Sequence, residues 1–493
     1  MISLTRLRLA KLQRLGPITA EQAMALIVVC GFAVRLVQAL LLPSVWHDEA
    51  VVLLSAIHLS FGQLFGPLIH HEAAPPLFMV IERAVYLTLG DSVFAFRLLP
   101  LLASCLSVLL MVNISWKLLP RWGAVIAVGL FSFSDRLIAH GVEAKPYALD
   151  VLIATATIAF FLHAESWTLR RRCLTVLPVF PVMLWLSFPA CFVLGGWFLS
   201  QTPALLRSRS RGDWLSALAL AGVVAVSFIV LVTGPIAAQR DASMESCWTG
   251  GFPDWSRPWM VPIWSVISTL NILGYCISPQ GWELMPLAIV GTIVLRRSAR
   301  PGLLTVLLAP LVLVYIAALL NKYPYCGQRV MVFMMPAACL VVAAGSLPAI
   351  VWFKQRRPWA NVIVVMALAM PLFGSIHRLI VPWDHPDHAS AVAIVRTQRQ
   401  PDDLIGFNHW EGEYYFRSHR SSWLLPGDSL PKGPLRMWYS AAAQDKNVRE
   451  TVIRAVPPVW QAQQRWEFQG VTLLLLTTEA ADATASYIPS FSE

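Results

Sequence analysis

The sequence predicts an all-α polytopic membrane protein with about eleven transmembrane helices, further helices on the outer membrane surface, and a small C-terminal α/β domain. Its 493 residues are 57% hydrophobic and only 13% charged, with a mean hydropathy of +0.61. A water-soluble globule cannot bury so much apolar surface, so lipid must form part of the surroundings of this chain. Recurrent long apolar runs and an abrupt change of composition after residue 380 complete the prediction.

Apolar runs of about 20 residues, the length that crosses the hydrocarbon core, recur along the chain. The first run follows a basic segment and lacks a small-residue cleavage site, so we expect a retained span rather than a removed signal peptide. The predicted spans are residues 22–42, 97–116, 122–140, 148–166, 173–187, 189–206, 214–234, 281–296, 302–320, 330–350 and 359–380.

The formal net charge of +10 indicates how the protein is oriented in the membrane. Lys and Arg are not gathered into one basic domain, as a nucleic-acid partner would require, but fall in short clusters between apolar runs. Because such clusters mark cytoplasmic loops, we expect the N-terminus inside and the segment after residue 380 outside. The clusters are Arg6, Arg8, Lys11 and Arg14; Lys117 and Arg121; Arg170, Arg171 and Arg172; Arg207, Arg209 and Arg211; Arg296, Arg297 and Arg300; and Lys354, Arg356 and Arg357.

Two apolar segments are expected to lie outside the membrane core. Residues 75–90 are short and carry Glu82 and Arg83 in their middle, and a charge at the bilayer centre costs at least ~2.5 kcal/mol. We therefore interpret them as an interfacial helix on the outer surface. Residues 259–277 are assigned to an outer loop, because counting them as a span would place the Arg296 cluster outside.

The composition divides the chain into a membrane domain, residues 1–380, and an outer domain, residues 381–493. The second part holds 13 of the 28 acidic residues. A small α/β domain is predicted there by a helical stretch at 387–399, strands at 403–408 and 435–439, and an apolar run at 471–477.

Two adjacent carboxylates follow the first span, in the predicted outer loop 43–96. Asp48 and Glu49 repel each other at a membrane boundary, where partial desolvation favours the protonated form of at least one of them. Such a group can take a proton from an acceptor hydroxyl as a general base. The alternative interpretation is a solvated loop start or a helix cap.

A second polar cluster, His70, His71 and Glu72, lies just before the Pro-Pro pair that opens the interfacial helix. Proline suits the first helical position because that position needs no backbone N–H. The three side chains suit a divalent ion or a phosphate-bearing ligand, and equally an exposed loop.

Two further clusters fall on the same predicted face. One is the tight turn between two spans, which combines an acid, a base and a phenol. The other is the entry to the tenth span, where an Arg beside Tyr hydroxyls can hold a lipid phosphate. The residues are Glu143, Lys145 and Tyr147 in the turn, and Tyr323, Tyr325 and Arg329 at the entry.

Four motifs are specific when they are taken together. They are Trp46-x-Asp48-Glu49-Ala50 after the first span, Ala74-Pro75-Pro76-Leu77-Phe78 at the next helix, Gly90-Asp91-Ser92…Phe96-Arg97-Leu98 at a span entry, and Glu143-x-Lys145-Pro146-Tyr147. Together they resemble the GT-C glycosyltransferases that use polyprenyl-phosphate sugars. The branch is similar to bacterial relatives of protein O-mannosyltransferases and of the aminoarabinose and galacturonic acid transferases that modify lipid A. The resemblance covers the spans to about residue 350, including the Tyr-Pro-x-x-Gly-x-Arg turn at 323–329.

The resemblance implies an enzyme of the bacterial inner membrane. One sugar would pass from a polyprenyl phosphate to a lipid, glycan or protein acceptor on the periplasmic side, with inversion at the anomeric carbon. Ala74 stands where some relatives place a Lys against the phosphate, so other groups must hold the phosphate here. Metal use varies in this superfamily, so a divalent ion is allowed and none is assigned. The implied roles are Asp48 as base, Glu49 in support and Glu143 as a second acid; Lys145, Tyr147, Tyr323, Tyr325 and Arg329 at the donor phosphate; and His70, His71 and Glu72 as contacts to substrate or metal.

A secondary transporter, or a flippase of a lipid-linked or small polar substrate, is the main alternative. It would carry ionisable residues inside the spans, near the bilayer midplane. Here the predicted span interiors are almost free of such residues, and the charges lie at the outer rim. A structural protein that binds its partners through the outer domain is a further alternative. An enzyme alone would release polyprenyl phosphate from a polyprenyl-phosphate sugar.

The charge pattern makes a direct prediction about topology. Single cysteines introduced at residues 145 and 420 should react with a membrane-impermeant maleimide from the periplasmic side, because both follow an odd number of predicted spans. Cysteines at residues 171 and 356 should react only after the cells are opened. Labelling of residue 145 from the cytoplasm would contradict the proposed position of every candidate site residue.

Overall fold

The computed structural model describes residues 18–41, 44–240, 248–279, 281–298, 300–381, 383, 385–424 and 434–479, so the basic cluster at residues 6–14 lies outside the described part. The chain forms two compact units. The first contains Met1–Leu40 and Ser60–Val381, and the second contains Leu41–Leu59 and Pro382–Glu493. The segment 41–59 thus belongs to the same compact unit as the C-terminal domain. The division at residue 380 that the sequence suggests would instead place this segment in the membrane domain.

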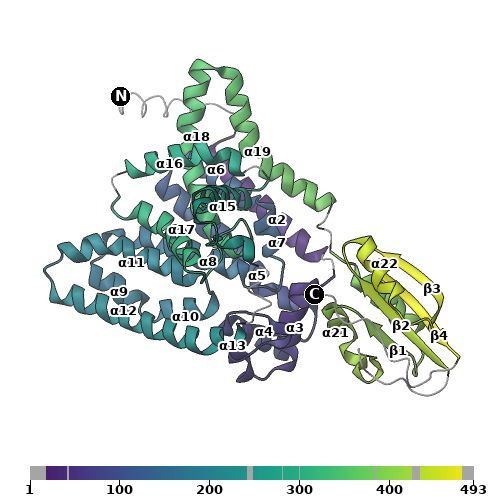
Figure 1. Ribbon diagram of the computed structural model, residues 1–493. Coiled ribbons are helices and arrows are strands. Elements are labelled where there is room, and N and C mark those ends of the chain that lie inside the picture. Colours follow the sequence, from purple (N-terminus) through teal and green to yellow (C-terminus); the bar gives the residue numbers. More distant parts are fainter. Residues whose placement is uncertain are drawn as a thin grey trace. The chain divides into compact units, whose positions relative to one another are not determined.

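The described residues of the first unit form helices and connecting turns (Figure 1). Within the described part of the chain, seven helical segments are long and apolar enough to cross a membrane, and α6 and α17 are shorter apolar helices. This arrangement confirms the predicted polytopic all-α fold. The α-helices are α2 (Ala20–Leu40), α4 (Pro76–Leu89), α5 (Val93–Leu118), α6 (Arg121–Ser132), α7 (Asp135–His140), α8 (Tyr147–His163), α9 (Leu169–Val176), α10 (Val179–Leu186), α11 (Ala190–Arg207), α12 (Arg211–Leu231), α13 (Ala237–Gln239), α15 (Val261–Cys276), α16 (Met285–Arg296), α17 (Leu303–Leu319), α18 (Met335–Arg356) and α19 (Pro358–Ile380).

Two of the predicted spans are each broken into two helices. The run 122–140 forms two helices, α6 and α7. The break lies just before Ser134, which caps the N-terminus of α7: its hydroxyl accepts the Leu137 N–H at 3.4 Å. The run 173–187 is α9 and α10, separated at Leu177 and Pro178. Proline cannot donate a helical hydrogen bond, so a break at this position is expected.

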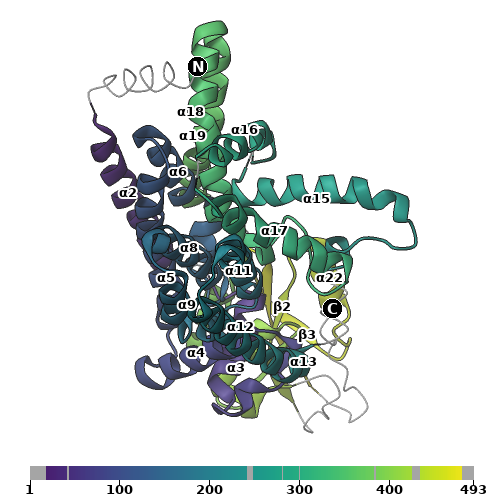
Figure 2. The ribbon, with the colours of Figure 1, turned by 90° about the vertical axis from the view of Figure 1, so that its left-hand side faces the viewer.

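The segment 259–277, expected in an outer loop, forms helix α15, and its length and hydropathy also qualify it as a candidate span. Figure 1 shows α15 end-on while α11 and α12 are seen from the side, and Figure 2 shows the reverse. The helix therefore runs crosswise to α11 and α12. Its assignment to an outer loop stays a prediction.

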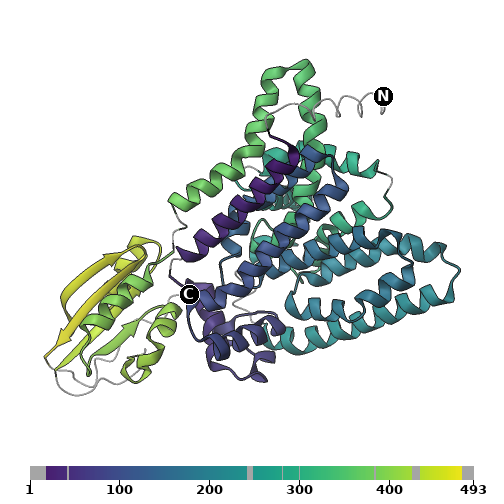
Figure 3. The ribbon, with the colours of Figure 1, turned by 180° about the vertical axis from the view of Figure 1, so that it is seen from behind.

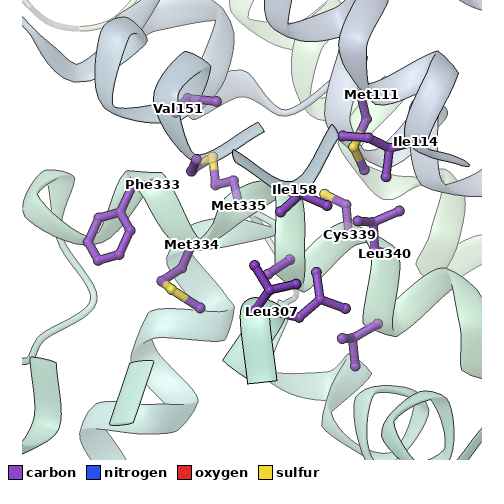
Figure 4. Packing of buried hydrophobic residues seen from close by; sticks show 14 of the residues in the cluster. Met111, Ile114, Val151, Ile158, Leu307, Phe333, Met334, Met335, Cys339 and Leu340 are labelled. Carbon is purple, nitrogen blue, oxygen red and sulfur yellow. The ribbon is translucent and has the colours of Figure 1, made fainter. Parts of the chain in front are cut away.

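The core of the first unit is built from side chains of α5, α8, α17 and α18 (Figure 4). Met111, Ile158, Leu307 and Leu340 are among these buried residues. The outward faces of other helices are equally apolar: Leu26 of α2 is 57% exposed and Leu215 of α12 is 67% exposed. Exposed apolar faces of this extent are stable against lipid rather than water.

The second unit joins helix α3 (His47–His58) to an α/β domain with a four-stranded sheet in the order β1-β2-β4-β3. Strands β1 and β2 are parallel, and the other neighbours are antiparallel. Helix α20 (His388–Gln398) packs on one face and α22 (Lys446–Arg454) on the other, as the opposite views of Figures 1 and 3 show. The remaining elements are α21 (Trp410–Phe416), β1 (Leu404–Phe407), β2 (Leu435–Ala442), β3 (Gln461–Phe468) and β4 (Val471–Thr478).

Glycine allows α16 and α18 to touch through their backbones. A Cβ on Gly345 would lie 2.0 Å from the Leu287 carbonyl oxygen, and one on Gly291 would lie 1.8 Å from the Val341 carbonyl oxygen. Small residues at helix interfaces permit this approach in membranes, where helix association depends on close packing rather than on hydrophobic burial.

Gly345→Leu should therefore prevent α16 and α18 from packing, at a cost above the roughly 1–3 kcal/mol of ordinary overpacking. The matched control is Gly222→Leu on α12, where a new Cβ would meet nothing within 4 Å. Thermal unfolding of the purified proteins in detergent, followed by size-exclusion chromatography, measures the difference. Equal melting temperatures for the two variants would contradict the described α16–α18 contact.

Candidate functional site

Asp48 and Glu49 occupy the first turn of α3, in the second unit. Glu49 is fully buried and Asp48 is partly exposed. The start of this helix is attached to the C-terminal domain: the Val45 N–H donates to the Tyr415 hydroxyl at 2.7 Å, and the Ser44 hydroxyl donates to Asp387 Oδ1 at 3.2 Å. Residues of the C-terminal domain thus fix the position of the acidic pair, whose charge the helix N-terminus favours.

In the first unit, the turn between α7 and α8 holds a chain of three polar side chains. His140 Nδ1 lies 3.0 Å from Glu143 Oε2, and His140 Nε2 lies 2.5 Å from the Tyr275 hydroxyl of α15. An ionised Glu143 can only accept, so His140 donates to it from Nδ1. The carboxylate of Glu143 is therefore held in one orientation by a histidine that is itself held.

Lys145 and Glu72 form a buried ion pair beside this turn. The Lys145 ammonium lies 2.7 Å from Glu72 Oε2, and the two side chains are 3% and 18% exposed. Glu72 also accepts the Ala73 N–H at 3.1 Å. The pair brings together two of the predicted clusters, because it joins the segment before α4 to the α7–α8 turn.

Two arginines add positive charge near Tyr275. The Arg136 guanidinium lies over the Tyr275 ring at 5.2 Å from the centroid, and the charge of Arg329 also acts on that phenol. Arg329 begins the 3₁₀ turn Arg329–Met334 and lies 5.7 Å from the Trp248 ring. Glu143, Arg136 and Arg329 therefore share one polar region of the first unit.

The other predicted residues have different surroundings. The Tyr323 hydroxyl donates to the Val330 carbonyl at 3.0 Å, and the Tyr325 hydroxyl pairs with Thr269 Oγ1 at 2.7 Å. Tyr147 begins α8, with its ring centroid 4.9 Å from that of His140. His70 and His71 both adopt left-handed backbone angles, which non-glycine residues rarely adopt and which mark functional or strained turns.

A further polar cluster, not anticipated from the sequence, lies in the second unit around Glu411 of α21. The Glu411 carboxylate is within 3.6 Å of imidazole nitrogens of His47, His388 and His409. Burial raises the pKa of Glu411, but the polar interaction with these histidines outweighs burial and holds the pKa well below its usual range. Burial lowers the pKa of His409 to about 4, so that ring is neutral at neutral pH.

Arg136 and Tyr275 also escaped the sequence analysis. Arg136 lies one helical turn before His140 on α7, a spacing that could have indicated it. Tyr275 belongs to the segment that was assigned to an outer loop without regard to its polar residues.

Removal of one partner of the Lys145–Glu72 pair should destabilise the protein by about 3–5 kcal/mol, because the other charge stays buried without compensation. Glu72→Gln and Lys145→Met should each lower the unfolding temperature in detergent, and the double variant should recover most of the loss. A double-mutant cycle on the unfolding free energies measures this coupling. Additive losses would show that the two charges do not depend on each other.

Comparison with known proteins places this geometry in a known fold. No family model matches the chain, and no curated protein matches it significantly. Two solved structures of ArnT, the lipid A aminoarabinose transferase, from Cupriavidus metallidurans match it over almost their whole length. The apo structure has 9% sequence identity and a TM-score of 0.52, and the match covers 92% of this chain and 97% of ArnT. The undecaprenyl phosphate complex has 11% sequence identity and a TM-score of 0.50, and the match covers 94% of this chain and 98% of ArnT. The chain therefore has the GT-C fold, in agreement with the resemblance of its motifs.

Proposed function

We propose that this protein is an inverting glycosyltransferase of the bacterial inner membrane, which moves a sugar from a polyprenyl phosphate to an envelope acceptor on the periplasmic side. The observation that carries the proposal is the match in fold to ArnT along 92% of the chain. A structure of ArnT contains undecaprenyl phosphate, which supports a donor on a lipid phosphate. Lys145 and Arg329 offer positive charge of the kind that such a donor needs.

The departing polyprenyl phosphate requires positive charge rather than an acid. A phosphate leaves as an anion that is stable without a proton, so the main help comes from fixed positive groups around it. We assign this role to Arg329 first, because a guanidinium matches phosphate oxygens in a bidentate contact. Lys145 contributes positive charge whose strength depends on its Glu72 partner.

The acceptor hydroxyl requires a base, and one carboxylate suffices. We assign this role to Asp48, which is partly exposed, while the fully buried Glu49 supports it from the same helical turn. Glu143 acts as a second acid, oriented by His140 and Tyr275. Tyr323 and Tyr325 stabilise the fold around the phosphate site, since their hydroxyls bond to Val330 and Thr269.

Asp48→Asn should nearly abolish transfer, because loss of a general base costs about 10²–10⁴ in rate, while donor binding stays intact. Arg329→Ala should instead weaken donor binding, because a contact to phosphate exists in the ground state as well as the transition state. The assay measures polyprenyl phosphate released from a radiolabelled polyprenyl-phosphate sugar, with membrane extract as the acceptor source.

Asp254→Asn and Arg257→Ala are the matched controls, since both residues are exposed and pair with each other. They should keep normal transfer and donor binding. Near-normal turnover of correctly inserted Asp48→Asn would pass the role of base to Glu49 or Glu143. Failure of the wild-type protein to release polyprenyl phosphate from any donor tested would argue against the proposed function.

A further inference from the structure

Glu411 and two histidines form a group of three buried side chains that the proposed transfer reaction does not use. His388 is the first residue of α20, His409 precedes α21, and Glu411 lies in its first turn. Their exposed fractions are 1%, 7% and 4%. The nitrogen and oxygen atoms that they offer all lie within 4.8 Å of one another.

The distances in this group differ from those of ordinary hydrogen bonds. His388 Nε2 lies 3.6 Å from Glu411 Oε1, and His409 Nδ1 lies 3.5 Å from Glu411 Oε2. A charge-assisted hydrogen bond would be about 2.7–2.9 Å long. Two ligands at about 2.0–2.2 Å from a tetrahedral ion are separated by roughly 3.3–3.5 Å, which is close to the observed spacing.

Two atoms of the group are also unsatisfied. His388 Nε2 and Glu411 Oε2 are buried and have no hydrogen-bond partner among the residues that the structure describes. Buried polar atoms almost always have a partner, so each such atom calls for an explanation. A cation between the two rings and the carboxylate would satisfy both atoms at once.

The surroundings of His409 fit coordination through Nδ1. Its Nε2 lies 3.1 Å from the Ser440 hydroxyl, and a ligand histidine usually bonds its other ring nitrogen in this way. In the described state Nδ1 accepts the Gly412 N–H at 3.0 Å. An ion would replace that N–H as the partner of the same lone pair.

We propose that His388, His409 and Glu411 bind a divalent ion of the zinc type. Two imidazoles and one carboxylate are a common set of three protein ligands for zinc, and they leave a fourth position open. His47 lies at this side of the group, with Nδ1 3.5 Å from Glu411 Oε2 and its ring stacked on Trp410 at 4.2 Å. The ion would thus stabilise the attachment of α3 to α21.

The experiment measures metal binding directly, on the full chain purified in detergent with an affinity tag that contains no histidine. Metal content is determined by mass spectrometry after purification without chelator. The metal is then removed with a chelator, and Co²⁺ is titrated while its visible absorption is recorded, since Co²⁺ reports tetrahedral coordination in zinc sites. The variants are His388→Ala and Glu411→Gln, with His419→Ala, an imidazole of the same domain outside the group, as the control.

We expect about one zinc ion per chain in the wild type and in His419→Ala, and binding weakened by at least tenfold in the other two variants. Metal removal should lower the unfolding temperature of the wild type and leave that of Glu411→Gln unchanged. A wild-type protein that contains no metal and binds no Co²⁺ would overturn the proposal, and so would equal binding by Glu411→Gln. In that case His388 and His409 hold the Glu411 carboxylate by electrostatic attraction, without a metal ion.

The effect on catalysis rests on the proposed function and is tested separately. Asp48→Asn should lose transfer and keep its zinc, whereas Glu411→Gln should lose zinc and keep donor binding. Zinc binding without any glycosyl transfer would support the metal site and contradict the proposed reaction.

Discussion

A charge inside a membrane protein is tolerated when the protein supplies polar partners, and Arg35 shows how this chain does so for two of its three guanidinium nitrogens, while Nη2 has no partner among the described residues. Arg35 lies in the first span and is fully buried. Its guanidinium donates to Ser104 Oγ at 2.8 Å and to the carbonyl oxygens of Gly31 and Ser132 at 3.0 and 2.8 Å. Ser132 is the last residue of α6, where a helix leaves carbonyl groups without internal partners. The buried arginine and the break after α6 therefore stabilise each other, and α2, α5 and α6 meet at this point.

The same break sets the position of the candidate site. The Phe133 carbonyl that it exposes accepts from the Ser375 hydroxyl of α19, and Ser134 then caps α7. Arg136 and His140 both lie on this short helix. Gly141 follows it, and a Cβ there would lie 2.7 Å from Ser104 Oγ, the hydroxyl that also accepts from Arg35. The Ser104 side chain thus contacts Arg35 of the first span by a hydrogen bond and packs closely against Gly141 at the start of the turn that carries Glu143.

The sequence predicts the membrane helices well because lipid demands long apolar runs, and such runs are visible without knowledge of the fold. It predicts the breaks poorly, since Ser134 and Pro178 lie within runs that are apolar as a whole. Strand β3 was missed for a different reason. It is a mostly exposed edge strand, and apolar alternation is limited to Trp466 and Phe468 because Gln residues fill its first half. Strands β2 and β4, which carry the buried core, were recognised.

The candidate site residues were chosen from local sequence, and their roles stay predictions. Asp48, Glu49, Glu143 and Lys145 stand in short motifs, which is why they could be proposed without knowledge of the fold. Pairing is a property of the tertiary structure: Glu72 and Lys145 are separated by 73 positions, and His140 and Tyr275 by 135. The group around Glu411 has the same character, because His388 begins α20 whereas His409 precedes α21.

The division of the chain into two units gives the C-terminal domain a role in the proposed reaction. The helix that carries Asp48 is held by Tyr415, Asp387 and the group around Glu411, all of the second unit. The proposed phosphate ligands Lys145 and Arg329 belong to the first unit, which has its own core. In the proposed reaction, the α/β domain would support the helix that carries the base Asp48, because a base must stay within about 0.5 Å of its productive position.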